Sequence, residues 1–164
     1  LGDSYIGLLV LKNKIKLNKL LSKYFINQYF MPNIQLKLAT QLKKFANTSI
    51  DISDGLLTDL DKMINAQKLS YKLKLKDIPI SKSLKKILNL NKLSKINFIS
   101  MGDDYQVLFT ASNNKSEFIK KLSINLGIKL TKIGIIQNNN KKSSIVDDNN
   151  LLINPKNRGY FHQF

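Results

Sequence analysis

The chain has 164 residues, with 27 lysines and arginines against 11 acidic residues, which gives a formal net charge of +16. It contains no cysteine and one histidine, so disulfides, thiolate metal sites and histidine-clustered metal sites are excluded. No apolar run approaches the roughly 20 residues that a membrane-spanning helix needs. The length and a hydrophobic content of 43% are typical of one globular domain with a real core.

The positive charge suggests nucleic-acid binding, but the residues that supply it argue against this function. Arg158 is the single arginine, and lysines are spread through nearly every segment of the chain. Arginine, with its planar fork, makes most of the specific contacts to phosphates and base edges in nucleic acids. A lysine-rich module for nucleic acid or acidic partners is therefore kept only as the alternative function.

The hydrophobic pattern predicts helices in the first third of the chain. One helix opens at Asp3 or Ser4, and a second runs from about Ile15 to Gln28. A third predicted helix carries a set of apolar residues on one face: Ile34, Leu38, Leu42, Phe45 and Ala46. A short strand at 48–50 then leads into a helix with apolar residues on one face: Leu56, Leu57, Leu60, Met63 and Ile64.

The second half of the chain alternates predicted strands and helices. Strands are expected at 71–76, 106–110 and 130–136, and a helix at 83–90. Residues 91–100 have an ambiguous pattern, in which a brief strand at 96–100 is one interpretation. A capping box at 114–117 opens a further helix that stops at Gly127, and 145–146 and 151–153 form a hairpin. This order of elements indicates an α+β protein (an α/β sandwich), with a mixed sheet packed against helices.

Two acidic clusters are candidates for a functional site. Asp51, Ser53 and Asp54 lie where a strand turns into a helix start, a place that suits phosphate and metal chemistry but also ordinary helix capping. Asp103 and Asp104 are adjacent carboxylates after a glycine, and their repulsion is relieved by water, a cation or a hydrogen-bonding ligand. A surface turn with two solvated aspartates explains the second cluster equally well.

The tail from residue 154 to 164 is rich in aromatic residues and holds the single arginine and the single histidine. Such a tail either docks onto the core or covers a ligand. We interpret His162 as structural, because a lone histidine is more often structural than catalytic.

Three segments, taken in order, resemble one enzyme family. Residues 50–60 (IDISDGLLTDL), 102–110 (GDDYQVLFT) and 159–164 (GYFHQF) are similar to the C-terminal domain of bacterial thiamine-monophosphate kinase, in the aminoimidazole ribonucleotide synthetase-like superfamily. Residues 1–12 resemble the junction into that domain, which then spans 13–164. The resemblance implies a cytoplasmic homodimer that transfers the γ-phosphoryl group of ATP to thiamine monophosphate with Mg²⁺, giving thiamine diphosphate.

The resemblance also implies roles for particular residues. Asp51 and Asp54 match magnesium-binding aspartates, and Ser53 matches a nucleotide contact. Asp103 and Asp104 match a substrate-binding segment, with Asp103 the better candidate, and a substrate-contacting aromatic residue corresponds to Tyr160. Oxygen-only ligation is what Mg²⁺ prefers.

The chain also departs from the family pattern. Met101 replaces a usual glycine, Gln106 replaces a common glutamate, and the ending around His162 is altered. The family's N-terminal domain, which supplies further magnesium aspartates and nucleotide contacts, is not in this sequence, so we expect no kinase activity from these residues alone. Another ATP-using member of the same superfamily is a second alternative.

Overall fold

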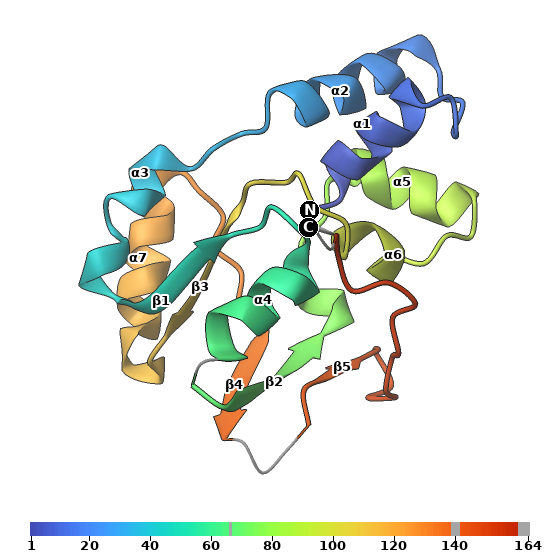
Figure 1. The fold of residues 1–164 in the computed structure, drawn as a ribbon. Coiled ribbons are helices and arrows are strands. Elements are labelled where there is room, and N and C mark those ends of the chain that lie inside the picture. The colour runs from blue at the N-terminus through green and yellow to red at the C-terminus, as the bar shows by residue number, and fades with distance from the viewer. Residues whose placement is uncertain (66, 139–141, 161–164) are drawn as a thin grey trace, which may run out of the picture.

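The computed structural model describes residues 1–65, 67–138 and 142–160 (Figure 1). Its α-helices are α1 (Asp3–Leu11), α2 (Lys19–Phe30), α3 (Leu36–Ala39), α4 (Leu56–Asn65), α5 (Lys82–Leu90), α6 (Ile96–Ile99) and α7 (Ser116–Leu126). Its strands are β1 (Ala46–Asp51), β2 (Leu69–Lys74), β3 (Val107–Ala111), β4 (Gly134–Asn138) and β5 (Ser144–Val146), and 3₁₀ turns occur at Leu42–Lys44, Leu75–Asp77 and Asn113–Lys115.

The strands form two small sheets. β1 pairs antiparallel with β3, so that Ile50 lies opposite Leu108 and Asp51 opposite Val107. In the second sheet β2 is central, antiparallel to β4 and parallel to β5. The parallel and antiparallel pairs make this second sheet mixed, as the sequence predicts, but the strands do not join into one sheet.

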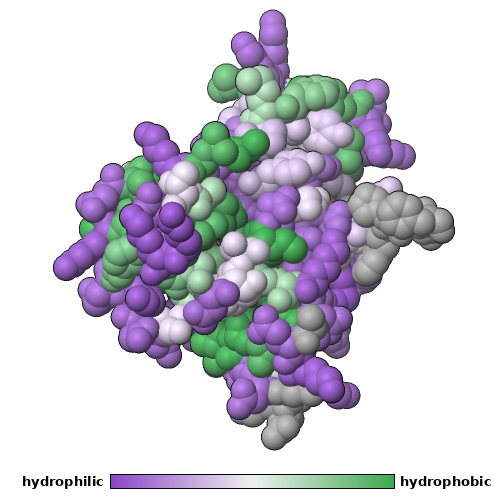
Figure 2. All heavy atoms as spheres, turned by 60° about the vertical axis from the view of Figure 1, so that its left-hand side comes forward, coloured by the Kyte–Doolittle hydropathy of each residue, from purple (hydrophilic) through white to green (hydrophobic). Residues whose placement is uncertain are grey.

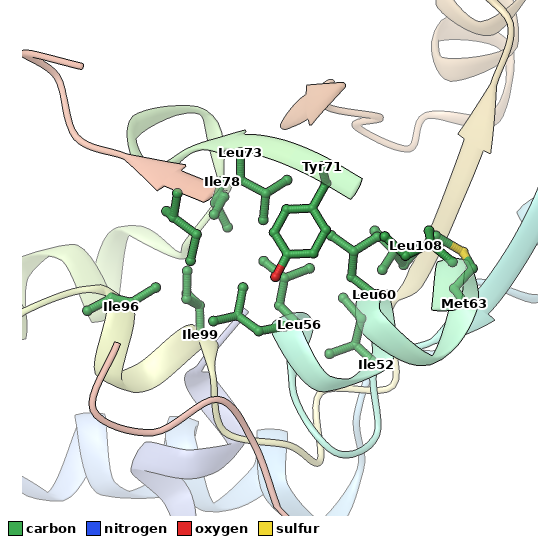
Figure 3. Close-up of a cluster of buried hydrophobic side chains, with 13 residues drawn as sticks. Ile52, Leu56, Leu60, Met63, Tyr71, Leu73, Ile78, Ile96, Ile99 and Leu108 are labelled. Atoms are coloured by element: carbon green, nitrogen blue, oxygen red, sulfur yellow. The ribbon is translucent and has the colours of Figure 1, made fainter. Parts of the chain in front are cut away.

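Most of the core lies between α4 and the second sheet. Leu56, Leu57 and Leu60 of α4 are almost fully buried against Tyr71 and Leu73 of β2 (Figure 3). A second apolar cluster joins α1 and α2 to α5, with Ile6, Phe25 and Leu84 fully buried. In Figure 1, α1, α2 and α5 lie together at the top, above the elements around α4.

The helix expected over residues 34–46 is wrong. The segment contains only the four-residue α3 and a 3₁₀ turn, and Ala46 already pairs with Ala111 in the first sheet. Phe45 is buried against Phe109 and Phe118, with ring centroids 5.1 and 5.9 Å away. Because of these aromatic contacts, Phe45 lies next to β3 and α7, and the chain continues from it as strand β1 and not as a helix.

The brief strand expected at 96–100 is also wrong, because α6 occupies this segment. Ile96 and Ile99 point into the cluster around α4, whereas Phe98 packs in the second cluster. A helical turn can direct these neighbouring side chains into two cores, and the hydroxyl of Ser100 donates to the carbonyl of Ile96 at 2.8 Å. α6 therefore links the two clusters.

Other boundaries differ in detail. The expected strand at 130–136 begins only at Gly134, and the predicted capping box does not form, since Lys115 caps α7 without a side-chain hydrogen bond. Gly127 ends α7 in the left-handed conformation, as predicted. The predicted hairpin is confirmed in minimal form by a bridge between Val146 and Leu152. Within the described ranges, no helix is long and apolar enough to span a membrane.

Candidate functional site

The three motif segments meet at the N-terminal end of α4. Main-chain N–H groups of Asp103 and Tyr105 donate to the carbonyls of Ser53 and Ile52, both at 2.8 Å. The N–H of Tyr160 donates to the carbonyl of Asp54, also at 2.8 Å. The tail therefore docks onto the core through Tyr160, while residues 161–164, which include His162, lie outside the described residues.

Close approach of the three segments depends on glycines. A Cβ on Gly102 would lie 1.9 Å from the carbonyl oxygen of Ser53, and one on Gly55 would lie 2.1 Å from that of Ser100. A Cβ on Gly159 would lie 2.0 Å from the hydroxyl of Thr58 on α4. Real Cβ atoms do not approach other atoms this closely, so each segment of the site needs its glycine.

Asp59, in the first turn of α4, holds the loop that precedes the helix. Its side chain is fully buried, and Oδ2 accepts the N–H groups of Ser53, Asp54 and Gly55 at 2.9, 2.9 and 3.1 Å. These N–H groups would otherwise be unsatisfied at a helix start. Since Asp59 already occupies them, a ligand phosphate would have to bind the site through other donors.

Lys62, one turn further along α4, lies between two carboxylates. Its ammonium donates to Oδ2 of Asp54 and, at 3.2 Å, to Oδ1 of Asp59. The hydrogen bond to Asp54 is the main cause that raises the pKa of Lys62. Neither Asp59 nor Lys62 stood out in the sequence, where an acid in the first turn of a helix is a common pattern.

The acidic and hydroxyl residues of the first motif differ in exposure. Asp51 is exposed at the end of β1, and Ser53 is half-buried in the loop. The side chain of Asp54 is 14% exposed where it pairs with Lys62. The backbone thus places all three around the start of α4, and both interpretations of the motif, as a helix start and as a ligand site, fit this position.

Asp103 and Asp104 occupy different environments although they are neighbours. Asp104 is buried, and its Oδ2 accepts the N–H of Gly2 at 2.7 Å; burial raises its pKa to about 6. Asp103 is half-buried beside Asp54, and burial, followed by the charge of Asp54, raises its pKa. Asp103 is therefore the carboxylate of this pair that is open to a ligand.

Tyr160 is 59% exposed, next to a firmly held stretch of the tail. Arg158 donates to Oδ2 of Asp61 at 2.7 Å and to the buried hydroxyl of Tyr71 at 2.8 Å. Its carbonyl accepts the hydroxyl of Thr58 at 2.9 Å. These contacts to α4 and β2 leave the ring of Tyr160 at the surface while fixing its backbone.

The two departures from the family pattern have local partners. Sδ of Met101 accepts a weak contact from the Asn157 amide at 3.6 Å, so it lies against the tail. Nε2 of Gln106 donates to the carbonyls of Asn33 and Asp104, both at 3.1 Å. An ionised glutamate has no proton to donate, so these bonds depend on the glutamine.

The donor set is compatible with part of a magnesium site. Among the described residues, no three histidine or acidic side chains form a cluster that could hold a metal alone. Mg²⁺ is usually held by one or two carboxylates together with water and substrate phosphates. The carboxylates of Asp54 and Asp103 are close enough to repel, which a cation would relieve.

Known proteins similar in sequence are thiamine-monophosphate kinases, although no family model matches the chain. The protein of Buchnera aphidicola subsp. Schizaphis graminum is 35% identical over 141 residues, and that of subsp. Acyrthosiphon pisum is 33% identical over 138 residues. The Escherichia coli K12 protein is 28% identical over 134 residues. The matches cover 81–83% of this chain and 41–42% of those proteins, so the chain spans less than half of their length.

Solved structures similar to this chain include thiamine-monophosphate kinases as well. A crystal structure of thiamine-monophosphate kinase from Stenotrophomonas maltophilia K279a is 25% identical with a TM-score of 0.73, over 90% of this chain and 47% of that one. AaThiL complexed with AMPPCP and TMP shows the same fold, with a TM-score of 0.75 at 24% identity over 98% of this chain and 48% of that one.

A more distant match is E. coli HypE, a hydrogenase maturation protein, with a TM-score of 0.60 at 15% identity over 96% of this chain and 49% of that one. Together these matches confirm the predicted α+β fold of the aminoimidazole ribonucleotide synthetase-like proteins. In sequence and in fold, therefore, the chain is similar to one portion, less than half in length, of the thiamine-monophosphate kinases.

Proposed function

We propose that the chain is the C-terminal, substrate-side portion of a thiamine-monophosphate kinase, which phosphorylates thiamine monophosphate to thiamine diphosphate with ATP. The observation that supports this proposal best is the meeting of residues 52–55, 102–105 and 158–160 through main-chain hydrogen bonds and close glycine contacts. These are the segments that carry the resemblance to the family. A structural match to AaThiL complexed with AMPPCP and TMP supports the two ligands.

The whole enzyme would need more than these residues. In this proposal residues 1–12 join an N-terminal domain, residues 13–164 form the substrate-side domain, and the assembled protein is a cytoplasmic homodimer. α1 makes up most of the junction and packs on the domain through the fully buried Ile6. The junction is therefore a folded helix, well suited to fix the orientation of a neighbouring domain.

Phosphoryl transfer depends on positioning and charge neutralisation more than on covalent catalysis. In the proposed site Asp51 and Asp54 hold Mg²⁺, and the hydroxyl of Ser53 donates to the nucleotide. Bound Mg²⁺ would neutralise the charge of the transferred phosphoryl group. Asp54 and Ser53 keep their positions because Asp59 fixes both of their main-chain N–H groups.

Thiamine carries a cationic thiazolium ring, which carboxylates and aromatic faces both attract. Asp103 supplies a half-buried carboxylate and Tyr160 an exposed ring, on two segments that both bind the 53–54 backbone. Asp104 belongs to the same substrate-binding segment, but its carboxylate already accepts the N–H of Gly2. We therefore assign the direct substrate contact to Asp103 and a supporting role to Asp104.

Calorimetric titration of the chain with thiamine monophosphate, in the presence of MgCl₂ and AMPPCP, tests this proposal. Asp103→Asn should weaken binding about tenfold or more, since a hydrogen bond or ion pair to a charged group is worth about 1.5–3 kcal/mol. Asp148→Asn, at an exposed carboxylate after β5, is the matched control and should bind as the unaltered chain does. No thiamine diphosphate should form until the missing domain is supplied.

Two results would contradict the proposal. One is thiamine monophosphate affinity that is equal in Asp103→Asn and the unaltered chain. The other is thermal stabilisation by DNA but not by thiamine monophosphate with Mg²⁺, which would favour the lysine-rich binding module. Hydrophilic and hydrophobic residues are interspersed over the face seen in Figure 2, so this face presents no continuous hydrophilic surface to such a partner.

A further inference from the structure

Lys62 forms an ion pair with the proposed magnesium ligand Asp54. It reaches from the last turn of α4 back to the loop, where its ammonium donates to Asp54 and to Asp59. The side chain of Lys62 is 49% exposed, while those of Asp54 and Asp59 are 14% and 1% exposed. A solvent-accessible cation is thus held between two carboxylates that are largely withdrawn from water.

Asp59 does not depend on this lysine alone. Three main-chain N–H groups converge on one of its oxygens at 2.9–3.1 Å, which is the usual way of stabilising a buried carboxylate. If the ammonium moved away, Asp59 would keep these three bonds and the loop would keep its shape. Asp54 would lose its ion pair with Lys62.

A cation that binds Asp54 would therefore meet Lys62 first. Both would share one carboxylate, and two positive charges a few ångströms apart repel each other. The ammonium is charged at neutral pH, as is usual for a lysine, and it contacts two carboxylates. Asp103 lies close enough to Asp54 for their charges to interact, and its negative charge favours a cation of higher charge at this place.

We propose that Lys62 is a built-in counter-ion, which holds Asp54 in the metal-free chain and competes with the divalent cation for it. This inference rests on the proposed function, in that it takes Asp54 as a magnesium ligand. Binding of Mg²⁺ then requires the ammonium to leave Asp54, and Asp59 provides the place to which the lysine stays tethered. The counter-ion offsets the repulsion between the carboxylates of Asp54 and Asp103, and it lowers the affinity for Mg²⁺.

The test is a titration of residues 1–164 with MgCl₂, followed by calorimetry and by the melting temperature. Lys62→Met should bind Mg²⁺ about fivefold more tightly than the unaltered chain, because Mg²⁺ no longer has to break the ion pair of Lys62 with Asp54, and a pair of unit charges about 4 Å apart in water is worth about 1 kcal/mol. Without Mg²⁺, Lys62→Met should melt at a lower temperature, and added Mg²⁺ should raise its melting temperature more than that of the unaltered chain.

Two control variants separate the charge of Lys62 from its bulk and its position. Lys62→Arg keeps the positive charge and should bind Mg²⁺ as weakly as the unaltered chain does. Lys120→Met removes a lysine that is paired in the same i,i+3 manner with Glu117 on α7, and should leave Mg²⁺ affinity unchanged. Lys62→Gln provides a second neutral side chain if Lys62→Met folds poorly.

Unchanged or weaker Mg²⁺ binding by the neutral variants would overturn the proposal, and so would equal affinities of Lys62→Arg and Lys62→Met. If both neutral variants fail to fold, Lys62 is a structural requirement and not an exchangeable counter-ion. The experiment is independent of the substrate assignment. Loss of thiamine monophosphate binding would count against the proposed function, whereas only the Mg²⁺ titration bears on Lys62.

Discussion

α4 and α7 are helices of ten and eleven residues with the same local charge pattern. Each carries an acid in its first turn that pairs with a lysine three positions later, Asp59 with Lys62 in α4 and Glu117 with Lys120 in α7. Most of α4 is buried, including Asp59. In α7, which the structure describes in full, no residue is buried, and the side chains of its ion pair are 75% and 70% exposed.

The difference between the helices shows that surroundings, rather than sequence pattern, decide what an ion pair does. In α7 the pair lies in water, where such pairs contribute about 0–1 kcal/mol. In α4 the same pattern faces a loop, so the acid fixes three main-chain N–H groups and the lysine reaches a second carboxylate. The proposed site lies at the start of α4, the helix whose residues are mostly buried in the core.

Replacement of the two acids should give the largest contrast. Asp59→Ala leaves three main-chain N–H groups at the start of α4 without their acceptor and removes one of the two carboxylates that Lys62 binds, so it should lower the free energy of unfolding by about 3–5 kcal/mol. Glu117→Ala should change it by no more than about 0.5 kcal/mol. Urea unfolding followed by circular dichroism measures both, and equal losses would mean that Asp59 is not the anchor of the loop.

Glycines near the two helices should differ in the same direction. Gly102→Ala puts a methyl group against the carbonyl of Ser53 and should cost about 3 kcal/mol, because main-chain atoms must move. The methyl group added by Gly127→Ala, at the end of α7, has no atom within 4 Å. Only the φ of +63° is unfavourable for alanine, so the free energy of unfolding should fall by about 1 kcal/mol. The melting temperatures of the two variants test this ranking. A smaller decrease for Gly102→Ala than for Gly127→Ala would contradict it.

The smallest expected effect concerns pH. Burial raises the pKa of Asp104 from 3.8 to about 6, so the folded chain binds more protons than the unfolded chain between about pH 4 and 6. The free energy of unfolding therefore falls as pH rises through this window, and the stability present below pH 4 is lost above pH 6.

Asp104→Asn keeps an oxygen that can accept the N–H of Gly2, and should remove about 2 kcal/mol of this fall. Glu117→Gln, at the exposed pair of α7, should leave the pH dependence as it is. Urea unfolding at pH 4, 5, 6 and 7 provides the measurement. Parallel curves for Asp104→Asn and the unaltered chain would show that Asp104 titrates normally.

Sequence patterns predicted the elements that are amphipathic and locally terminated. The strand before residue 51, α4, α5 and the stop of α7 at Gly127 are all confirmed. The expected helix over 34–46 and the strand at 96–100 failed because contacts distant in sequence decided them. Phe45 packs on Phe109 and Phe118, and α6 serves two hydrophobic clusters at once.

The site was predictable only in part. Spacing alone did not bring residue 54 next to residue 160, and only the resemblance to a family suggested that the segments act together. Asp104, unlike Asp103, has a partner at the N-cap of α1, Gly2, and a local sequence pattern does not reveal this contact. The functional roles of Asp51, Ser53, Asp54, Asp103, Asp104 and Tyr160 stay predictions.

The bonds that join the three segments run between main-chain atoms, from Asp103 to Ser53, Tyr105 to Ile52 and Tyr160 to Asp54. Such bonds are indifferent to which side chains the residues carry. Side chains around the site, such as Met101 and Gln106, can therefore differ from the family pattern without changing the course of the backbone. The glycines at 55, 102 and 159 have no such freedom, because any side chain there would collide with a neighbouring segment.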